Sequence, residues 1–358
     1  MASRKLLPVF QEELNRRERE YGPVKELKDP IEDVRGPRKD GEKQAKSDLE
    51  EEQSRGSIRM ERVSIRRSKG PGEMKATMVT PKDPGDNLSE RPCITFLHGG
   101  LLMGSDEHVG LELWGPLLAL EFRAVVISPG YRRVPDSHGL ELVQDCYDAV
   151  HWAWKNVQFH PEKFFLFGAS AGGLLAACTT KLVVRTNEFK LGGLILEAPM
   201  LDPACDSESM EELSEPNHYL HKQQVEFGWE KYLEGETSED AIPVKATQED
   251  IEKFPPTFVA SGVSDPLNSE ARAFAGRRED FVLWEAQGSP HGFHMIKPKA
   301  SVSIDYKAWA KGTIGKLSGI APIDDASRLP ASNTTSEETK SGSATISGTS
   351  TTGQGSAT

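Results

Sequence analysis

Short apolar runs alternate with longer amphipathic segments through the middle of the chain. The apolar runs have the length of buried strands and lie at 93–97, 124–128, 164–167, 194–196, 257–260 and 281–284. Helical spacing of apolar residues marks 140–156, 171–184 and 303–317. Strands that alternate with helices predict an α/β fold with a mostly parallel central sheet covered by helices on both faces.

The pattern differs on both sides of this region. Residues 59–64 and 74–79 alternate between apolar and polar positions around a glycine-rich turn, which predicts an antiparallel hairpin at the start of a domain spanning 58–320. Between about 200 and 252 the alternation of strand and helix stops. The segment 206–233 there is polar and helical in pattern, and we expect this insertion to form part of a small helical lid over the carboxyl ends of the strands.

The two ends of the chain are polar. Residues 1–57 are rich in charge: 6–21 has helical spacing, whereas 25–55 is nearly all charged or polar and is expected to be flexible. Residues 321–358 are rich in serine, threonine and glycine and contain no aromatic side chain, which predicts a disordered tail.

Composition narrows the class of partner. The 358 residues carry a formal net charge of −12, which argues against nucleic acid or an anionic membrane as the main partner. No apolar stretch approaches the roughly 18–20 residues of a membrane span. The N-terminus has no apolar run of signal-peptide length, and four scattered cysteines suit a reducing compartment, so a cytoplasmic protein is expected.

The segment Gly168-Ala-Ser-Ala-Gly172 follows one predicted strand and opens a predicted helix. Strand, sharp turn and helix form the setting of a nucleophile elbow, in which Ser170 would occupy a strained turn between small neighbours. The amino end of the helix offers unpaired N–H groups and a positive dipole, which favour developing negative charge. The pattern therefore predicts Ser170 as a catalytic nucleophile.

A serine nucleophile needs a base and an orienting carboxylate. His291 lies just past the predicted strand 281–284, with His294 as its close rival. Asp265 follows the strand 257–260, and Asp202, which follows 194–196, is the alternative. The chain order Ser170, Asp265, His291 is the order of the α/β-hydrolase fold.

The segment His98-Gly99-Gly100 follows the strand 93–97. Adjacent glycines let backbone N–H groups approach a ligand, so the N–H groups of Gly99, Gly100 and Ala171 are expected to form an oxyanion hole. The apolar residues expected to line the substrate pocket are Leu101, Leu102, Met103, Phe293 and Met295. His218 and His221 have spacing that could pair as metal ligands, but no third ligand is evident, so no metal site is predicted.

Six motifs occur together in order over roughly residues 59–317. They are His98-Gly-Gly100 with Gly104-Ser105, Tyr131-Arg132 with Pro135, Gly168-Ala-Ser-Ala-Gly-Gly173, Phe254-Pro-Pro256, Asp265-Pro-Leu267 and His291-Gly-Phe293. This set resembles the hormone-sensitive-lipase-type esterases and lipases of the α/β-hydrolase superfamily. The resemblance implies the triad and oxyanion hole given above, a lid built from the N-terminal segment and the insertion, and no metal or organic cofactor.

Three features depart from the family pattern. Leu101 replaces the usual third glycine after His-Gly-Gly, and the loop to Gly104-Ser105 is one residue short, which would displace the oxyanion donors. The segment between Asp265 and His291 is somewhat short, which could trim a helix. Ala169 stands where the family usually has an acidic residue.

The expected function is hydrolysis of a carboxylic ester of a small or medium hydrophobic substrate through an acyl-enzyme on Ser170. A thioesterase, lactonase or amidase of a biosynthetic pathway is an alternative, because one triad serves all these substrates. A second alternative is a catalytically weak or inactive homologue that binds a small molecule without turning it over. The intact triad argues against this second alternative, and Leu101 argues for it.

Overall fold

The computed structural model describes residues 4–21, 30–83, 87–213 and 219–322. One sheet of eight strands has the order β1-β2-β4-β3-β5-β6-β7-β8. The strands are β1 (Ile58–Arg66), β2 (Glu73–Pro81), β3 (Cys93–Leu97), β4 (Val125–Pro129), β5 (Phe164–Ala169), β6 (Gly193–Glu197), β7 (Thr257–Gly262) and β8 (Val282–Ala286). The predicted mostly parallel sheet and its leading hairpin are confirmed.

Strand pairing brings the loops that carry polar residues to one edge. β1 and β2 pair antiparallel, as do β2 and β4, whereas β4, β3, β5, β6, β7 and β8 are mutually parallel. Parallel strands have their carboxyl ends at the same edge of the sheet. The loops after β3, β5, β6, β7 and β8 therefore leave the sheet side by side.

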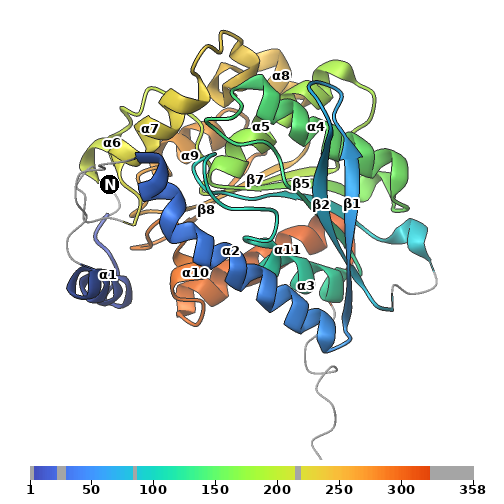
Figure 1. Cartoon of the computed structure of the whole chain (residues 1–358), viewed down its shortest axis with the longest axis horizontal. Coiled ribbons are helices and arrows are strands. Elements are labelled where there is room, and N and C mark those ends of the chain that lie inside the picture. Colours follow the sequence, from blue (N-terminus) through green and yellow to red (C-terminus); the bar gives the residue numbers. More distant parts are fainter. Residues whose placement is uncertain (1–3, 22–29, 84–86, 214–218, 323–358) are drawn as a thin grey trace, which may run out of the picture. The chain divides into compact units, whose positions relative to one another are not determined.

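Helices cover both faces of the sheet (Figure 1). They are α1 (Pro8–Tyr21), α2 (Pro30–Ser54), α3 (Leu111–Phe122), α4 (Leu140–Asn156), α5 (Ala171–Thr186), α6 (Glu208–Glu212), α7 (Lys222–Tyr232), α8 (Gln248–Lys253), α9 (Asn268–Ala275), α10 (Phe293–Ile296) and α11 (Ser301–Ser318). Single 3-10 turns lie at Leu88–Glu90, Pro161–Lys163, Glu239–Ala241 and Pro243–Lys245. Helices α4, α5 and α9 pack on one face, and α3 and α11 pack on the other.

The residues of the central strands divide alternately between two apolar cores. In β5, Leu166 belongs to the core beneath α4 and α5, whereas Phe165 and Phe167 belong to the core beneath α3 and α11. This alternation follows from the two-residue period of a strand, and both faces are buried because helices cover both. It also sends Glu197, which shares a face with Ile195 in β6, toward α11.

The N-terminal segment is more ordered than its composition suggested. The predicted helix near 6–21 is confirmed as α1, but the prediction of a flexible segment over 25–55 is wrong for Pro30–Ser54, which forms α2. Leu49 of α2 is fully buried, and Ala45 is nearly so, because this helix packs across α3 and β1. These two apolar positions, four residues apart, supply the contact. The overall composition of the charged stretch around them does not reveal it.

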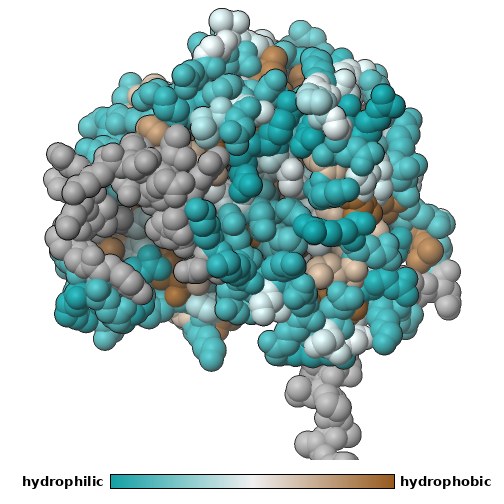
Figure 2. Space-filling view, in the orientation of Figure 1, coloured by the Kyte–Doolittle hydropathy of each residue, from teal (hydrophilic) through white to brown (hydrophobic). Residues whose placement is uncertain are grey.

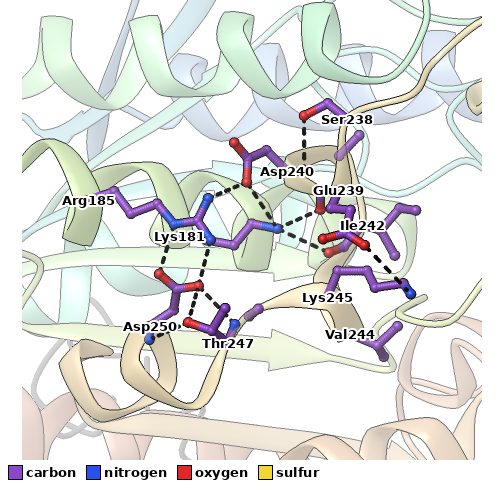
Figure 3. Close-up of polar contacts among 12 residues, drawn as sticks. Lys181, Arg185, Ser238, Glu239, Asp240, Ile242, Val244, Lys245, Thr247 and Asp250 are labelled. Carbon is purple, nitrogen blue, oxygen red and sulfur yellow. Dashed lines mark hydrogen bonds and ion pairs between the residues drawn. The ribbon is translucent and has the colours of Figure 1, made fainter.

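The insertion between β6 and β7 contains α6, α7 and α8, so its predicted helical character is confirmed for the described residues. Its second half is held on α5 by two cations one helical turn apart (Figure 3). Lys181 is almost fully buried, and its ammonium donates to the carbonyls of Glu239 at 2.8 Å and Ile242 at 3.2 Å. A buried ammonium is tolerable only when acceptors surround it, so these carbonyls fix the segment on α5.

Arg185 completes this anchor. Its guanidinium forms a bidentate pair with Asp250, with N···O distances of 2.8 and 2.7 Å, and also pairs with Asp240. The hydrogen bonds from Arg185 hold the pKa of Asp250 well below its usual value. The segment 238–250 is therefore tied to the same helix whose amino end follows Ser170.

The surface seen in Figure 2 is mostly hydrophilic, with apolar residues scattered in small patches. No helix within the described residues is long and apolar enough to cross a membrane. The predicted disordered tail, from residue 323 onward, lies outside the described residues.

Candidate active site

Ser170 occupies a sharp turn between β5 and α5. Its backbone has φ 57° and ψ −121°, a region that a residue other than glycine rarely adopts. Gly168 and Gly172 let this turn close: a Cβ on Gly168 would lie 2.3 Å from the carbonyl oxygen of Gly172, and one on Gly172 would lie 2.0 Å from that of Leu97. The turn therefore has the strand, strained serine and helix of the predicted elbow.

Ser170, His291 and Asp265 form a continuous hydrogen-bonded chain. The Oγ of Ser170 lies 3.0 Å from Nε2 of His291, and Nδ1 of His291 lies 2.8 Å from Oδ2 of Asp265. Asp265 is fully buried, and its other oxygen accepts the N–H of Leu267 at 2.9 Å. With Nδ1–H donating to Asp265, Nε2 is free to accept the serine proton, which is the arrangement of a nucleophile, base and orienting carboxylate.

The loops that carry Asp265 and His291 are joined by backbone hydrogen bonds. The N–H of Val263 donates to Ala286, and that of Ser264 donates to Ser289, at 2.9 and 3.0 Å. Gly262 permits this approach, because a Cβ there would lie 2.2 Å from the carbonyl oxygen of Ser289. Between the two loops the chain forms a single helix, α9.

The alternative acid and base lie elsewhere. The Oδ1 of Asp202 accepts the N–H of Ala204 at 3.0 Å. His294 is buried, and its Nε2 lies 3.3 Å from Oε1 of Glu197. The geometry therefore favours Asp265 and His291 over these two for the triad.

Gly99 and Gly100 lie beside the serine. A Cβ on Gly99 would be 3.0 Å from that of Ser170, and both glycines line the cavity next to the serine. Gly100 has φ +119°, and a Cβ there would lie 2.2 Å from the carbonyl oxygen of Gly104. Ala171, the third expected donor, is the first residue of α5. The two segments expected to form the oxyanion hole thus flank Ser170.

Leu101 and Leu102 both adopt left-handed backbone conformations, with φ of 53° and 63°. The N–H groups of Met103 and Gly104 close the turn on the carbonyl of Gly100, at 3.2 and 2.9 Å. A left-handed residue other than glycine costs roughly 1–2 kcal/mol, so glycine at position 101 would adopt this conformation with less strain. The shorter loop therefore still reaches Ser170, with strain placed on two leucines.

Tyr131 packs against His98, in the loop that carries Gly99 and Gly100. Its hydroxyl donates to the carbonyl of His98 at 2.6 Å, and its ring stacks on that of His98 with centroids 4.3 Å apart. Burial lowers the pKa of His98 to about 4, so this imidazole is neutral near pH 7. The sequence placed Tyr131 in a motif without assigning it this role.

A cavity of about 190 Å³ opens next to Ser170 and His291. Leu101 and Met295, both expected to line the pocket, line this cavity. Leu102, Met103 and Phe293 do not: the first two are fully buried in the core beneath α4 and α5, and Phe293 lies in the opposite core. Their predicted contact with substrate is not supported by this cavity, because the tight turn after Gly100 returns Leu102 and Met103 to one core and Phe293 packs in the other.

Sequence reasoning missed several residues of the cavity wall. They are Phe96, Ser105, Val109, Trp114, Glu197, Tyr219, Leu220 and, in a role other than catalytic base, His294. One signal was present: Glu197 is an acidic residue at the carboxyl end of an otherwise apolar strand. Trp114 and Tyr219 come from α3 and the insertion, and only the tertiary structure brings them beside Ser170.

The N-terminal segment contacts both catalytic loops. The N–H of Leu7 donates to the carbonyl of Gly288, three residues before His291, at 2.8 Å. The guanidinium of Arg4 donates to Oδ1 of Asn268 and the carbonyl of Val263, at 3.1 and 3.3 Å. It also pairs with two glutamates of α6. The segment therefore bridges the Asp265 loop, the His291 loop and the insertion.

One group of residues has the chemistry of metal ligands. The ligand-type atoms of Asp106, Glu107 and His108 lie within 4.8 Å of one another. Asp106 pairs with Nδ1 of His108 at 3.0 Å, and Arg62 pairs with Glu107 at 3.0 Å, so partners within the protein already engage these groups. Of the histidine pair considered from sequence, His221 caps α7, and His218 lies outside the described residues.

Comparisons with known proteins agree with this geometry. A family model for the α/β-hydrolase fold matches residues 94–295, more than half of the chain. An arylesterase of Saccharolobus solfataricus is 28% identical over 220 residues, covering 59% of this chain and 71% of the relative. An esterase of Fusarium pseudograminearum is 26% identical over 235 residues, covering 61% and 72%.

Among solved structures, a bacterial heroin esterase superposes with a TM-score of 0.75 at 23% identity, covering 87% of this chain and 98% of that one. At this level of identity the likeness shows the fold. The chain belongs to the α/β-hydrolase fold family, and its resemblance to the hormone-sensitive-lipase-type members is confirmed. The predicted class of enzyme, an esterase-type hydrolase, is confirmed as well.

Proposed function

We propose that this protein cleaves carboxylic esters of small or medium hydrophobic substrates through an acyl-enzyme on Ser170. The observation that carries the proposal is the hydrogen-bonded chain from Ser170 through His291 to the buried Asp265, with distances of 3.0 and 2.8 Å. This hydrogen-bonded triad adjoins a cavity large enough for a short acyl or alcohol group. Relatives named as esterases support the same reaction.

In the first half-reaction, Nε2 of His291 accepts the proton of Ser170 as its Oγ attacks the ester carbonyl. The carbonyl oxygen becomes an oxyanion, which the N–H groups of Gly99, Gly100 and Ala171 stabilise. Asp265 holds the proton on Nδ1 and stabilises the imidazolium. Cleavage of the ester C–O bond releases the alcohol with the proton from His291 and leaves the acyl group on Ser170.

In the second half-reaction, His291 takes a proton from water, and the hydroxide formed attacks the acyl carbonyl. The same N–H groups stabilise the second oxyanion, and the bond between Ser170 and the acyl carbon breaks. His291 returns the proton to Oγ, which regenerates the enzyme and releases a carboxylic acid. No step requires a group beyond these residues and water.

Covalent labelling tests the nucleophile directly. A fluorophosphonate probe should modify Ser170 rapidly, as peptide mapping would show, and should leave Ser170→Ala unlabelled. Ser170→Ala should also lose at least about 10³-fold in kcat on 4-nitrophenyl butyrate, because only the oxyanion hole and substrate binding remain. A folded wild-type protein that neither reacts nor turns over esters would support the small-molecule binder instead.

The compartment is a further part of the proposal. All four cysteines are buried as free thiols, which supports a reducing environment such as the cytoplasm. Cell fractionation of the tagged full-length chain tests it, and recovery in a secreted or membrane fraction would contradict it.

A further inference from the structure

An acidic residue, Glu197, lines the cavity beside Ser170. Glu197 is the last residue of β6, and its backbone carbonyl accepts the N–H of Ser170 at 2.7 Å. Its side chain is 10% exposed. Oε2 accepts the hydroxyl of Tyr306 at 2.6 Å, and Oε1 lies 3.3 Å from Nε2 of His294. A carboxylate accepts about four hydrogen bonds, so this group retains acceptor capacity beyond these two partners.

The two side-chain partners of Glu197 are a phenol and an imidazole. Tyr306 is fully buried, and burial raises the pKa of its phenol, so the phenol is neutral. Burial also lowers the pKa of the His294 imidazole, which favours the neutral ring. No lysine or arginine in the described part of the chain lies within 4.0 Å of the Glu197 carboxylate. A cation bound in the cavity would supply a counter-ion that the described basic residues do not supply.

Aromatic residues line the same cavity. Phe96, Trp114 and Tyr219 line the cavity together with Glu197 and His294. Trp114 lies 6.2 Å from His294, ring centroid to ring centroid, so the indole and the carboxylate's imidazole partner are neighbours. Aromatic faces attract ammonium groups, and the attraction grows when the cation is removed from water. A carboxylate among aromatic rings suits the binding of an ammonium group, whereas the aromatic rings alone are sufficient to bind an alkyl chain.

We propose that this cavity selects esters that carry a cationic ammonium group and that Glu197 determines the preference. The inference rests on the proposed esterase activity and adds the substrate class to it. The ammonium group can belong to the acyl part or to the alcohol part of the ester, because the cavity adjoins Ser170 and His291, which both parts approach during the reaction. Glu197 acts by binding and takes no part in bond cleavage.

The test compares substrates that share shape and differ in charge. In the acyl arm, the 4-nitrophenyl ester of 4-(trimethylammonio)butanoate is compared with that of 5,5-dimethylhexanoate. In the alcohol arm, acetylthiocholine is compared with S-(3,3-dimethylbutyl) thioacetate. The measured quantity is the ratio of kcat/KM, cationic over neutral, at fixed pH and ionic strength. We expect a ratio of at least about 10 in one arm, equivalent to about 1.4 kcal/mol.

A matched pair of variants separates the cavity carboxylate from the overall charge. Glu197→Gln should reduce the ratio to about 1, mainly through KM for the cationic substrate. Glu226→Gln makes the same change on α7, where the side chain is 48% exposed, and should leave the ratio unchanged. The ratio is internal to each variant, so a general loss of activity cancels. The net charge of −12 attracts cations at long range, but that effect is screened by salt and would respond equally to both variants.

A wild-type measurement keeps the proposal testable if Glu197→Gln fails to fold. Choline should inhibit hydrolysis of 4-nitrophenyl butyrate competitively, at a concentration at least about tenfold lower than 3,3-dimethylbutanol. A ratio below about 10 in both arms overturns the proposal, as does equal inhibition by the two alcohols or an equal response of the two variants. Absence of turnover on every ester, with no labelling of Ser170, overturns the proposed function instead.

Discussion

Strained backbone is concentrated around the nucleophile. Ser170, Leu101, Leu102 and Ser105 all have positive φ, and all lie in the two loops that meet at the cavity. Such conformations cost of order 1–3 kcal/mol each and persist where the surrounding packing enforces them. Here they hold the half-buried serine and a tight glycine loop at one point, which agrees with a site organised before substrate arrives.

The carboxylate of the triad can be identified by paired substitutions. Asp265→Asn should lower kcat by roughly 10⁴-fold, because the amide favours the wrong tautomer of His291. Asp202→Asn should change kcat much less, since its carboxylate accepts the backbone N–H of Ala204, away from the triad. Steady-state kinetics on a 4-nitrophenyl ester measure both, and a reversed order would move the role to Asp202.

Leu101 should limit the size of the cavity. Its side chain is 2% exposed and lines the cavity, and the Cβ position of Gly228 in α7 is 3.6 Å from its Cδ2. Leu101→Gly relieves about 1–2 kcal/mol of backbone strain, but the loss of a buried side chain lowers stability by roughly 2–5 kcal/mol. We expect a less stable enzyme whose preferred acyl chain is longer. Chemical denaturation and a 4-nitrophenyl ester series measure these effects, and an unchanged chain-length optimum would contradict this role.

Among the elements, the N-terminal segment and the insertion complete the site that the sheet begins. Neither contributes a triad residue, yet Arg4 reaches the Asp265 loop and Tyr219 of the insertion lines the cavity. The hydroxyl of Tyr219 also donates to the carbonyl of Phe10 in α1, at 3.0 Å. The two lid elements expected from the family resemblance are thus in contact with each other beside the cavity.

Removal of the Arg4 side chain should loosen this arrangement. Arg4→Ala deletes hydrogen bonds to Asn268, Ser269 and the carbonyl of Val263, so we expect kcat to fall several-fold and the free energy of unfolding to drop by roughly 1–3 kcal/mol. Arg19→Ala, an exposed position in the last turn of α1, serves as the control. Equal kinetics in the two variants would show that the segment does not position the loops.

The anchor of the insertion should weaken in acid. Because Arg185 lowers the folded-state pKa of Asp250 below its usual 3.8, the pair stabilises the fold fully above about pH 4 and less as the pH falls. Asp250→Asn should therefore lower the free energy of unfolding near neutral pH and flatten its decline below about pH 4. Urea denaturation between pH 3 and pH 7 tests this, and parallel curves for the two proteins would contradict it.

The molecule as a whole divides into a well-packed region and a polar tail. Two apolar cores fill the described part of the chain, whereas residues 321–358 are rich in serine, threonine and glycine. The tail's composition gives little apolar surface to bury.

Truncation after Ala321 should therefore leave the molecule almost unchanged. We expect the same kcat and a Tm within about 2 °C of the full chain, because a polar tail buries little. A fall in Tm of more than about 5 °C, roughly 1 kcal/mol or more for a domain of this size, would mean that the tail packs on the domain.

The linear sequence was sufficient for the fold class and for the elements of the central sheet. Strands such as Cys93–Leu97 and the helix Leu140–Asn156 have the predicted bounds, because runs of buried apolar residues and helical periodicity are local signals. The triad could be predicted for a related reason. Gly168 and Gly172, and residues placed just after apolar strands, are local sequence features typical of sites at the carboxyl edge of a sheet.

Only the tertiary structure decided what surrounds the triad. Leu102, Met103 and Phe293 are apolar like Leu101, yet a left-handed turn and two opposed cores bury them away from the cavity. Helix α2 is ordered because Leu49 meets α3 and β1, a contact that the charge of its own segment does not reveal. The carboxylate of Glu197 meets His294 and Tyr306 because helices α10 and α11 bring these two residues to it. Contacts between distant segments depend on how elements pack in three dimensions, and local periodicity carries no information about that packing.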